Sequence, residues 1–234
     1  MALYAIGDLH LSLGSDKPMD VFGGAWVGYV DKLREGLSVI GPEDTTILLG
    51  DLSWALDLNG AREDFAMIAA IPGRKIIVKG NHDYWWNGIT KLRDSAPDSS
   101  FYGLQTDAVK IGKHIFVGSR GWTCPGSPDF SAEDEKLFAR ETERFRLALD
   151  CGKALREEGD ELIVLIHYPP FSLRSPDTDF TRLFEAYGVK KVVFGHLHGG
   201  SYFPLKTEKN GITYYLTSCD KANFRLTEIE KDEA

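Results

Sequence analysis

The stretch Leu3-Tyr4-Ala5-Ile6-Gly7-Asp8-Leu9-His10 sets a pattern that the rest of the chain repeats. A short apolar run leads into a polar motif, and the same order returns before Gly50-Asp51, Gly80-Asn81-His82-Asp83, His167 and Gly195-His196-Leu197-His198. Short continuous apolar runs are typical of β-strands that are buried on both faces. Because such strands end at one edge of a sheet, we expect the polar side chains to converge there. The glycines before them permit sharp turns and a close approach of the backbone.

The histidines concentrate in these motifs. Five of the six histidines lie within them, and only His114 lies outside. Imidazole and oxygen ligands without a thiolate suit divalent metals such as Mn, Fe, Co, Ni or Zn. Two such ions side by side clamp the attacking and leaving oxygens of a phosphoryl displacement. The sequence therefore predicts a two-metal site and phosphate-ester hydrolysis, with no catalytic role for His114.

Length, composition and charge narrow the class of protein. The chain has 234 residues, 43% of them hydrophobic and 26% charged, and no linker or internal repeat, so we expect a single domain over residues 1–234. The cysteines Cys124, Cys151 and Cys219 are scattered, which predicts free thiols in a reducing cytoplasm. No signal peptide and no apolar run of about 18 residues is present, which argues against a membrane protein. A net charge of −8 argues against nucleic-acid binding, although two bound cations still let an acidic protein hold a phosphate ester.

Helical periodicity fills the gaps between the expected strands. We expect helices over residues 25–40, 61–71, 131–158 and 179–187, the third of them after a capping-type start at Ser131. Further strands are expected over 211–217 and 224–229, with a hairpin over 108–119. Alternating strands and helices followed by strand-rich segments predict an α/β fold in which two sheets pack together with helices outside.

The ordered motifs Asp-x-His, Gly-Asp, Gly-Asn-His-Asp, His and Gly-His-x-His resemble those of the calcineurin-like metallophosphoesterase superfamily. The resemblance spans Asp8 to His198 and is of the bacterial type. One motif alone is a weak signal, but five motifs in this order, each after an expected strand, are specific. The resemblance implies a four-layered α/β/β/α sandwich of two mixed sheets flanked by helices.

The resemblance also implies a ligand set for two divalent ions, with hydroxide formed at the ions as the nucleophile. The implied ligands are Asp8, His10 and His198 for one ion, Asn81, His167 and His196 for the other, and Asp51 as the bridge. Mn²⁺ is our choice by analogy with the family, and Fe²⁺, Zn²⁺, Co²⁺ and Ni²⁺ suit the same ligands.

Two residues beside the ligands are implied to take part in catalysis. His82 would act as a general acid or electrostatic partner for the leaving oxygen. Asp83 would then orient the ring of His82, since a carboxylate often fixes the tautomer of an imidazole.

One departure from the superfamily bears on the substrate. Its phosphoprotein phosphatases carry Asp-Arg-Gly after the second motif, whereas here Gly50-Asp51 continues as Leu52-Ser53-Trp54. Without that arginine to neutralise a dianionic monoester, we favour a phosphodiester or nucleotide-type small molecule. A small-molecule phosphomonoesterase and a non-catalytic metal-binding interaction module are the alternatives. A nuclease would need a basic groove, which the acidic composition does not favour. The sequence gives no indication of the oligomeric state.

The candidate substrate contacts are basic and aromatic. Arg120 precedes a Gly/Pro-rich stretch and is positioned in sequence to grip a phosphate, while Arg174 is a second basic residue of interest. Either arginine also fits a surface salt bridge. The aromatic run Tyr84-Trp85-Trp86 has two interpretations, stacking on a flat leaving group or packing in the core.

Overall fold

The protein is described here by a computed structural model, which covers residues 1–15, 17 and 19–231. The first half of the chain contains β1 (Ala2–Ile6), η1 (Met19–Phe22), η2 (Gly24–Trp26), α1 (Tyr29–Leu37), β2 (Thr45–Leu49), α2 (Arg62–Ala69), β3 (Arg74–Val78), α3 (Ile89–Asp94) and β4 (Phe101–Leu104). The second half contains β5 (Asp107–Ile111), β6 (His114–Ser119), α4 (Asp134–Leu155), β7 (Glu161–Ile166), α5 (Asp179–Ala186), β8 (Lys191–Phe194), β9 (Lys206–Lys209), β10 (Ile212–Leu216) and β11 (Thr227–Lys231).

Two mixed sheets form the centre of the molecule. The first has the strand order β11-β1-β2-β3-β4, with β1 to β4 parallel and β11 antiparallel at the edge beside β1. The second has the order β5-β6-β7-β8-β10-β9, with β6, β7, β8 and β10 parallel and an antiparallel strand at each edge. All the strands that precede the polar motifs therefore lie in parallel parts of the two sheets.

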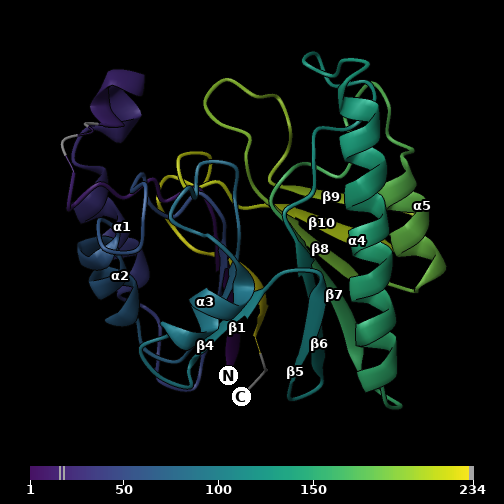
Figure 1. Cartoon of the computed structure of the whole chain (residues 1–234), viewed down its shortest axis with the longest axis horizontal. Helices are drawn as coiled ribbons and strands as arrows, with labels where there is room; N and C mark the ends of the chain where they lie inside the picture. Colours follow the sequence, from purple (N-terminus) through teal and green to yellow (C-terminus); the bar gives the residue numbers. More distant parts are fainter. Residues whose placement is uncertain (16, 18, 232–234) are drawn as a thin grey trace.

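Alternate residues of each apolar run face two different cores. In β2, Ile47 and Leu49 pack into the layer between the sheets, whereas Leu48 packs outward. In β7, Ile163 packs between the sheets and Val164 packs outward. Figure 1 shows α1 and α2 on the outer side of one sheet and α4 and α5 on the outer side of the other. The expected four-layered α/β/β/α sandwich is confirmed. The single domain expected over residues 1–234 stays a prediction.

Several boundaries differ from those expected. The first helix begins at Tyr29 instead of residue 25, because Gly24–Trp26 form a 3₁₀ turn and Gly28 has a φ of 64°. The last strand begins at Thr227 instead of residue 224, since Phe224 has a φ of 59° that an extended strand does not allow. The short elements α3, β4 and β9 were not predicted, because four to six residues carry too little periodicity.

The start of α4 also differs from the expected capping motif. The N-cap residue is Glu133, and its side chain makes no capping hydrogen bond. Instead the carboxylate of Asp134 accepts hydrogen bonds from the backbone N and the Oγ of Ser131, at 2.8 and 2.6 Å. Serine therefore donates at this helix start, where it was expected to accept.

Cys124, Cys151 and Cys219 are free thiols, as predicted. Among the described residues, no helix has both the length and the apolar character needed to cross a membrane.

The outer core beneath α4 and α5 generates a stability prediction. Phe145 is fully buried, with its ring centroid 5.5 Å from that of Phe180 and 5.6 Å from that of Phe184. We expect Phe145→Ala to lower the free energy of unfolding by about 3–5 kcal/mol, because it removes buried surface and leaves a cavity. Leu147→Ala on the exposed face of the same helix is the control and should change it by less than about 0.5 kcal/mol. Urea unfolding followed by circular dichroism measures both, and equal losses would contradict this account of the core.

Candidate metal centre

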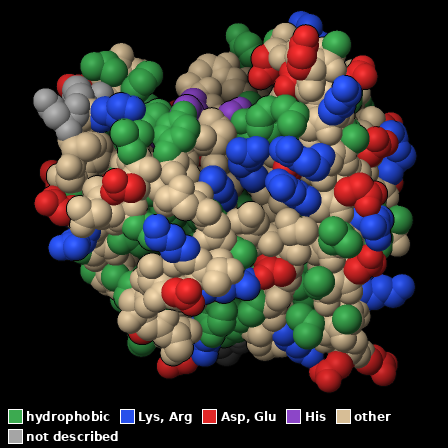
Figure 2. Space-filling model, in the orientation of Figure 1, with side chains coloured by type: hydrophobic (Ala, Val, Ile, Leu, Met, Phe, Trp, Pro, Cys, Tyr) green, Lys and Arg blue, Asp and Glu red, His purple; other side chains and the backbone are tan. Residues whose placement is uncertain are grey.

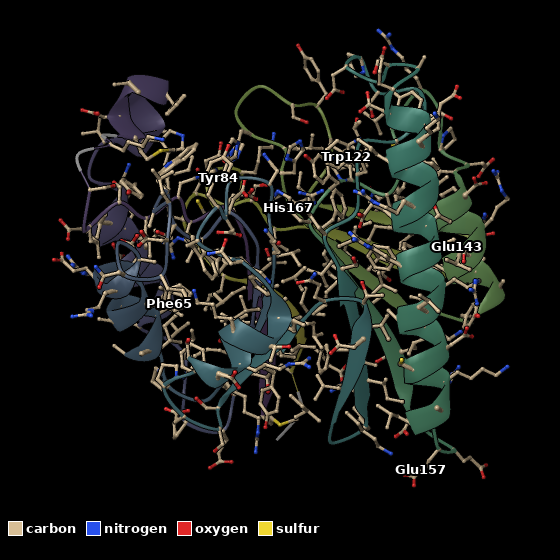
Figure 3. All side chains as sticks on the ribbon, viewed as in Figure 1. Phe65, Tyr84, Trp122, Glu143, Glu157 and His167 are labelled. Carbon is tan, nitrogen blue, oxygen red and sulfur yellow. The ribbon has the colours of Figure 1, made fainter. Side chains whose placement is uncertain are left out.

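The polar motifs meet at one end of the two sheets. They directly follow β1, β2 and β3 of the first sheet and β7 and β8 of the second. Figure 3 shows His167 between the two halves of the molecule, with Tyr84 on one side and Trp122 on the other. In Figure 2, histidine side chains are visible in a hollow between hydrophobic groups, near a cluster of Lys and Arg side chains. The expected convergence on the edge of one sheet is thus corrected: both sheets contribute.

Two groups of ligand-type side chains form at this end. Within each group, one atom of every side chain lies within 4.8 Å of the others, and the groups are Asp8 with His10 and His198, and Asp51 with His167 and His196. Asn81 joins the second group, with its Oδ1 2.8 Å from His167 Nε2 and 3.0 Å from His196 Nδ1. All seven residues that the sequence nominated as ligands are therefore brought together.

Asp51 faces both groups with a single oxygen. Its Oδ2 lies 3.9 Å from His10 Nε2 and 3.5 Å from His167 Nε2. Its other oxygen, Oδ1, accepts a 2.7 Å hydrogen bond from the backbone N–H of His82. The orientation of the carboxylate is thus fixed by the neighbouring turn.

Asp8 is fixed from the opposite sheet. The backbone N–H of His196, just after β8, donates to Asp8 Oδ2 at 2.9 Å, and Asp8 Oδ1 lies 3.7 Å from His198 Nε2. The Asp8 and Asp51 side chains are both buried, with exposed fractions of 0% and 1%. A buried carboxylate is costly unless it is paired or hydrogen-bonded, so these contacts are needed for the fold itself.

The backbone at the candidate ligands is unusual. Asp8, His10, Asp51 and His196 have φ angles of 58°, 47°, 51° and 71°, in the left-handed region that side chains other than glycine seldom adopt. Hydrogen bonds between neighbouring strand ends hold them, from Asp8 N to Gly50 O and from His10 N to Asp51 O, each at 2.9 Å. Strain of this kind persists where the surroundings enforce it, and it is commonly found at functional sites.

The glycines permit the close approach expected from the sequence. A Cβ on Gly80 would lie 2.0 Å from Asp51 Oδ1, and a Cβ on Gly195 would lie 2.6 Å from Asp8 Oδ2. Both distances are far shorter than any tolerated contact. Gly80 and Gly195 therefore bring two chain segments against the buried carboxylates.

The hydrogen bonds of the histidine rings indicate whether cations can bind at this centre. His198 Nδ1 donates to Asp220 Oδ1, and His167 Nδ1 donates to the carbonyl of Leu49, both at 2.9 Å. In the neutral form that binds a cation, each ring therefore turns an unprotonated Nε2 toward the carboxylates. His10 Nε2 lies only 3.3 Å from His198 Nε2 and 3.9 Å from Asp51 Oδ2, so nitrogen and oxygen atoms of metal-ligand type converge there. A divalent ion satisfies such an arrangement, and the nitrogen and oxygen donors match Mn, Fe, Co, Ni or Zn.

The pKa values of two histidines follow from the same charges. Burial disfavours protonation of His167, but Asp51, which also accepts a hydrogen bond from it, and Asp8 outweigh burial and raise its pKa to about 9. Burial lowers the pKa of His10 to about 3, and the nearby His198 adds to this effect against the attraction of Asp51. Without bound ions, the carboxylates thus attract a proton to one ring and leave the other neutral.

Asp83 has partners other than the expected one. Its carboxylate accepts hydrogen bonds from the backbone N–H groups of Gly80, Asp51 and Leu52 at 2.7–2.8 Å, and from Trp85 Nε1 at 2.9 Å. The expected contact with the ring of His82 is not among the hydrogen bonds of the described residues. Burial, together with the charge of Asp51, raises the pKa of Asp83 to about 6. Asp83 thus holds the turns after β2 and β3 together.

His82 lies beside the first group of ligands. Its ring centroid is 5.7 Å from that of His10 and 4.6 Å from that of Trp54. Its Nδ1 is buried and has no hydrogen-bond partner among the described residues. The ring is therefore positioned by packing against aromatic neighbours.

The aromatic run after the third motif belongs to the core. Trp85 and Trp86 are 0% and 3% exposed, and Trp86 Nε1 donates to Gln105 Oε1 at 2.9 Å. Tyr84 alone is exposed, with its ring centroid 6.2 Å from that of His82. The packing interpretation therefore holds for both tryptophans.

The two arginines considered as substrate contacts lie in different surroundings. The backbone carbonyl of Arg120 accepts hydrogen bonds from the N–H groups of His167 and Tyr168, and its guanidinium lies 4.9 Å over the ring of Trp122. Arg174 is exposed on a loop.

His114 is at the start of β6, at the opposite end of that strand from the site, where it forms a third group with Glu161 and Glu230. Lys191 Nζ lies 2.5 and 2.8 Å from those two glutamates, and Lys113 Nζ lies 2.6 Å from Glu230, so two lysines pair with the two carboxylates.

Asp220 is a site residue that sequence reasoning missed. It follows β10, 22 residues after His198, in no recognisable motif. Besides His198, it accepts a 2.8 Å hydrogen bond from the backbone N–H of Gly199. A single aspartate carries no pattern, so only the folded chain reveals this contact.

Comparisons with known proteins agree with this architecture. A sequence model of the calcineurin-like phosphoesterase family matches residues 1–200, which include every candidate ligand. The comparison with curated proteins gives no match.

The solved structures similar to this chain show its fold. Phosphopantetheinyl hydrolase from Mycobacterium tuberculosis is 14% identical, with a TM-score of 0.56 over 99% of this chain and 96% of that one. A protein from Thermus thermophilus is 9% identical, with a TM-score of 0.54 over 97% and 96%. A protein of unknown function from Aquifex aeolicus is 17% identical, with a TM-score of 0.50 over 97% and 95%.

The contact between His198 and Asp220 generates a prediction about metal affinity. Asp220→Asn removes the charge that fixes the ring of His198, and we expect the affinity for Mn²⁺ to fall about 10–100-fold while the fold is retained. The control is Asp31→Asn, since the Asp31 side chain is 84% exposed. Competition with a metallochromic chelator measures the affinity, and an unchanged value in Asp220→Asn would rule out this positioning role.

Proposed function

Because the chain belongs to the calcineurin-like phosphoesterase family, we propose that it is a dinuclear metal-dependent phosphoesterase that acts on a phosphodiester or nucleotide-type small molecule. The observation that carries the proposal is the pair of ligand groups that face one oxygen of Asp51. Two-metal sites with ions about 3.5–4 Å apart commonly share such a carboxylate.

The proposed ligand assignment follows the two groups. Asp8, His10 and His198 would hold one ion, Asn81, His167 and His196 would hold the other, and Asp51 would be shared between them. The 2.8 and 3.0 Å distances from Asn81 Oδ1 to the two histidines of its group support the second set. Mn²⁺ is the proposed metal, with Fe²⁺, Zn²⁺, Co²⁺ and Ni²⁺ compatible with the same donors.

Bound ions would supply Lewis-acid stabilisation of the phosphoryl oxygens and lower the pKa of water. The protein's own side chains would supply proton transfer and positioning. His82 is proposed to hold the proton that passes to the leaving oxygen, supported by its position beside His10 at the edge of the centre. Asp83 is proposed to act as a positioning residue that fixes the turns carrying Asp51 and Asn81.

The substrate's phosphate is proposed to meet a basic side chain as well. Arg120 is the candidate, because its carbonyl is hydrogen-bonded to the backbone of His167 and its guanidinium rests on Trp122. A guanidinium donates two parallel hydrogen bonds to a phosphate. The preference for a diester rests on the sequence after Asp51, where Leu52-Ser53-Trp54 supplies no arginine for a dianionic monoester.

The first experiment tests the proposed centre and the substrate class together. The protein is stripped with a chelator and reloaded with Mn²⁺, and its hydrolysis of bis-p-nitrophenyl phosphate and p-nitrophenyl phosphate is compared. Asp51→Asn should lower the rate by at least roughly 10²-fold, because it removes the shared charge. Asp31→Asn, in which the changed side chain is exposed, should retain the rate.

The outcomes of this experiment separate the candidate functions. Faster hydrolysis of the diester supports the proposal, and faster hydrolysis of the monoester indicates a phosphomonoesterase. No hydrolysis of either ester with Mn²⁺, Fe²⁺, Co²⁺, Ni²⁺ or Zn²⁺ would overturn the enzymatic proposal and favour a metal-binding interaction module.

The role of His82 is tested by changing the leaving group. His82→Asn should lower the rate about 10²–10⁴-fold on dibenzyl phosphate, whose alkoxide must be protonated as it leaves. On bis-p-nitrophenyl phosphate the loss should be under about tenfold, because p-nitrophenolate departs without a proton. The control is Tyr84→Phe, which changes an exposed neighbour of His82. An equal loss on both esters would show that His82 does not act as the acid.

A further inference from the structure

A cavity of about 440 Å³ opens beside the first group of candidate ligands. Its inner wall is formed by three histidines, and its lining consists of Met19, Phe22, Trp26, Trp54, Gly199 and Asp220 together with His10, His82 and His198. This volume is in the range of small-molecule binding sites. The cavity therefore adjoins both the candidate metal centre and the residue proposed to protonate the leaving oxygen.

The aromatic walls are held in place from behind. The ring of Trp54 stacks on that of His10, with centroids 4.8 Å apart and planes 23° apart, and its Nε1 contacts Met19 Sδ at 2.9 Å. The ring of Trp26 packs edge-on against Tyr29 and Phe224. Walls fixed in this way do not have to be ordered when a ligand binds, which favours affinity.

The mouth of the cavity exposes apolar surface. Phe22, in the short helix η1, lines the cavity although the residue is 65% exposed. The ammonium of Lys17 lies 4.3 Å over the ring of Trp54. A ligand ring in the cavity would cover Phe22 and gain the free energy of apolar burial.

The cavity offers few hydrogen bonds to a polar ligand. Besides the histidines and the indole N–H groups of Trp26 and Trp54, the only polar side chain among its described lining residues is that of Asp220. Both Asp220 oxygens are already engaged, Oδ1 with His198 Nδ1 and Oδ2 with Gly199 N. A sugar or polyol would leave hydroxyl groups unpaired at about 1–3 kcal/mol each, whereas a flat apolar ring would not.

We propose that this cavity binds the leaving group of the substrate, and that the leaving group carries a planar aromatic or heteroaromatic ring of about nucleobase size. The assignment to the leaving group rests on the proposed function, since His82 lines the cavity and is the proposed acid. The preference for a ring rests on the lining alone.

The test measures binding, so it does not depend on turnover. The Mn²⁺-loaded protein is titrated calorimetrically with 2-naphthylmethylphosphonate, a non-hydrolysable analogue of an aryl phosphate, and with 3-hydroxypropylphosphonate. We expect the naphthyl compound to bind at least about tenfold more tightly. Phe22→Ala should weaken it about 3–10-fold and leave the hydroxypropyl compound unaffected. Val21→Ala, which alters an exposed neighbour that is not part of the lining, is the matched control.

Equal affinities for the two phosphonates would overturn the proposal, as would equal effects of Phe22→Ala and Val21→Ala. The hydrolysis assay with bis-p-nitrophenyl phosphate keeps the two proposals separate. Metal-dependent hydrolysis without a preference for the ring defeats the cavity assignment only. Absence of hydrolysis defeats the proposed function, while a ring preference that Phe22→Ala reduces still supports the cavity as a ring-binding site.

Discussion

The burial of two carboxylates where the sheets meet is the constraint on which the rest of this structure depends. Asp8 and Asp51 are almost fully excluded from solvent, and such charges are tolerated only with close compensation. That compensation comes from the backbone N–H groups of His82 and His196 and from three histidines. His10 follows a strand of the first sheet, and His167 and His198 follow strands of the second. The sheets must therefore lie face to face with their parallel strands ending on the same side. The apolar layer between them stabilises this arrangement, and the candidate metal centre is its polar end.

The same constraint accounts for the backbone around the centre. Turns that direct several short polar side chains to one point cannot follow ordinary strand geometry, which explains the left-handed φ angles of Asp8 and Asp51. Hydrogen bonds between strand ends and to Asp83 hold these conformations from behind. A rigid support of this kind fixes ligand positions in advance, so little reorganisation is required when ions bind.

The two sides of the centre differ in chemistry. On one side, Trp54 and Trp26 form an apolar wall beside His10 and His82. On the other, Arg120 lies over Trp122, and the ring of Tyr168 lies 4.2 Å from that of His196. Figure 3 shows Trp122 and Tyr84 on opposite sides of His167. An ester bound across the centre would thus have Arg120 on one side and, on the other, the aromatic cavity with Lys17 over Trp54.

The sequence by itself determined the strands that precede Asp8, Asp51, Asn81, His167 and His196, because an apolar run and its terminating motif are local features. It also determined the fold class and the candidate ligand set, through the order of those motifs. Only the tertiary structure decided the partners of Asp83, the contact between Asp220 and His198, and the aromatic cavity. The physical reason is distance along the chain. Asp220 and Trp26 reach His198 through packing between segments far apart in sequence, and a single residue without periodicity leaves no local signal of where it will lie.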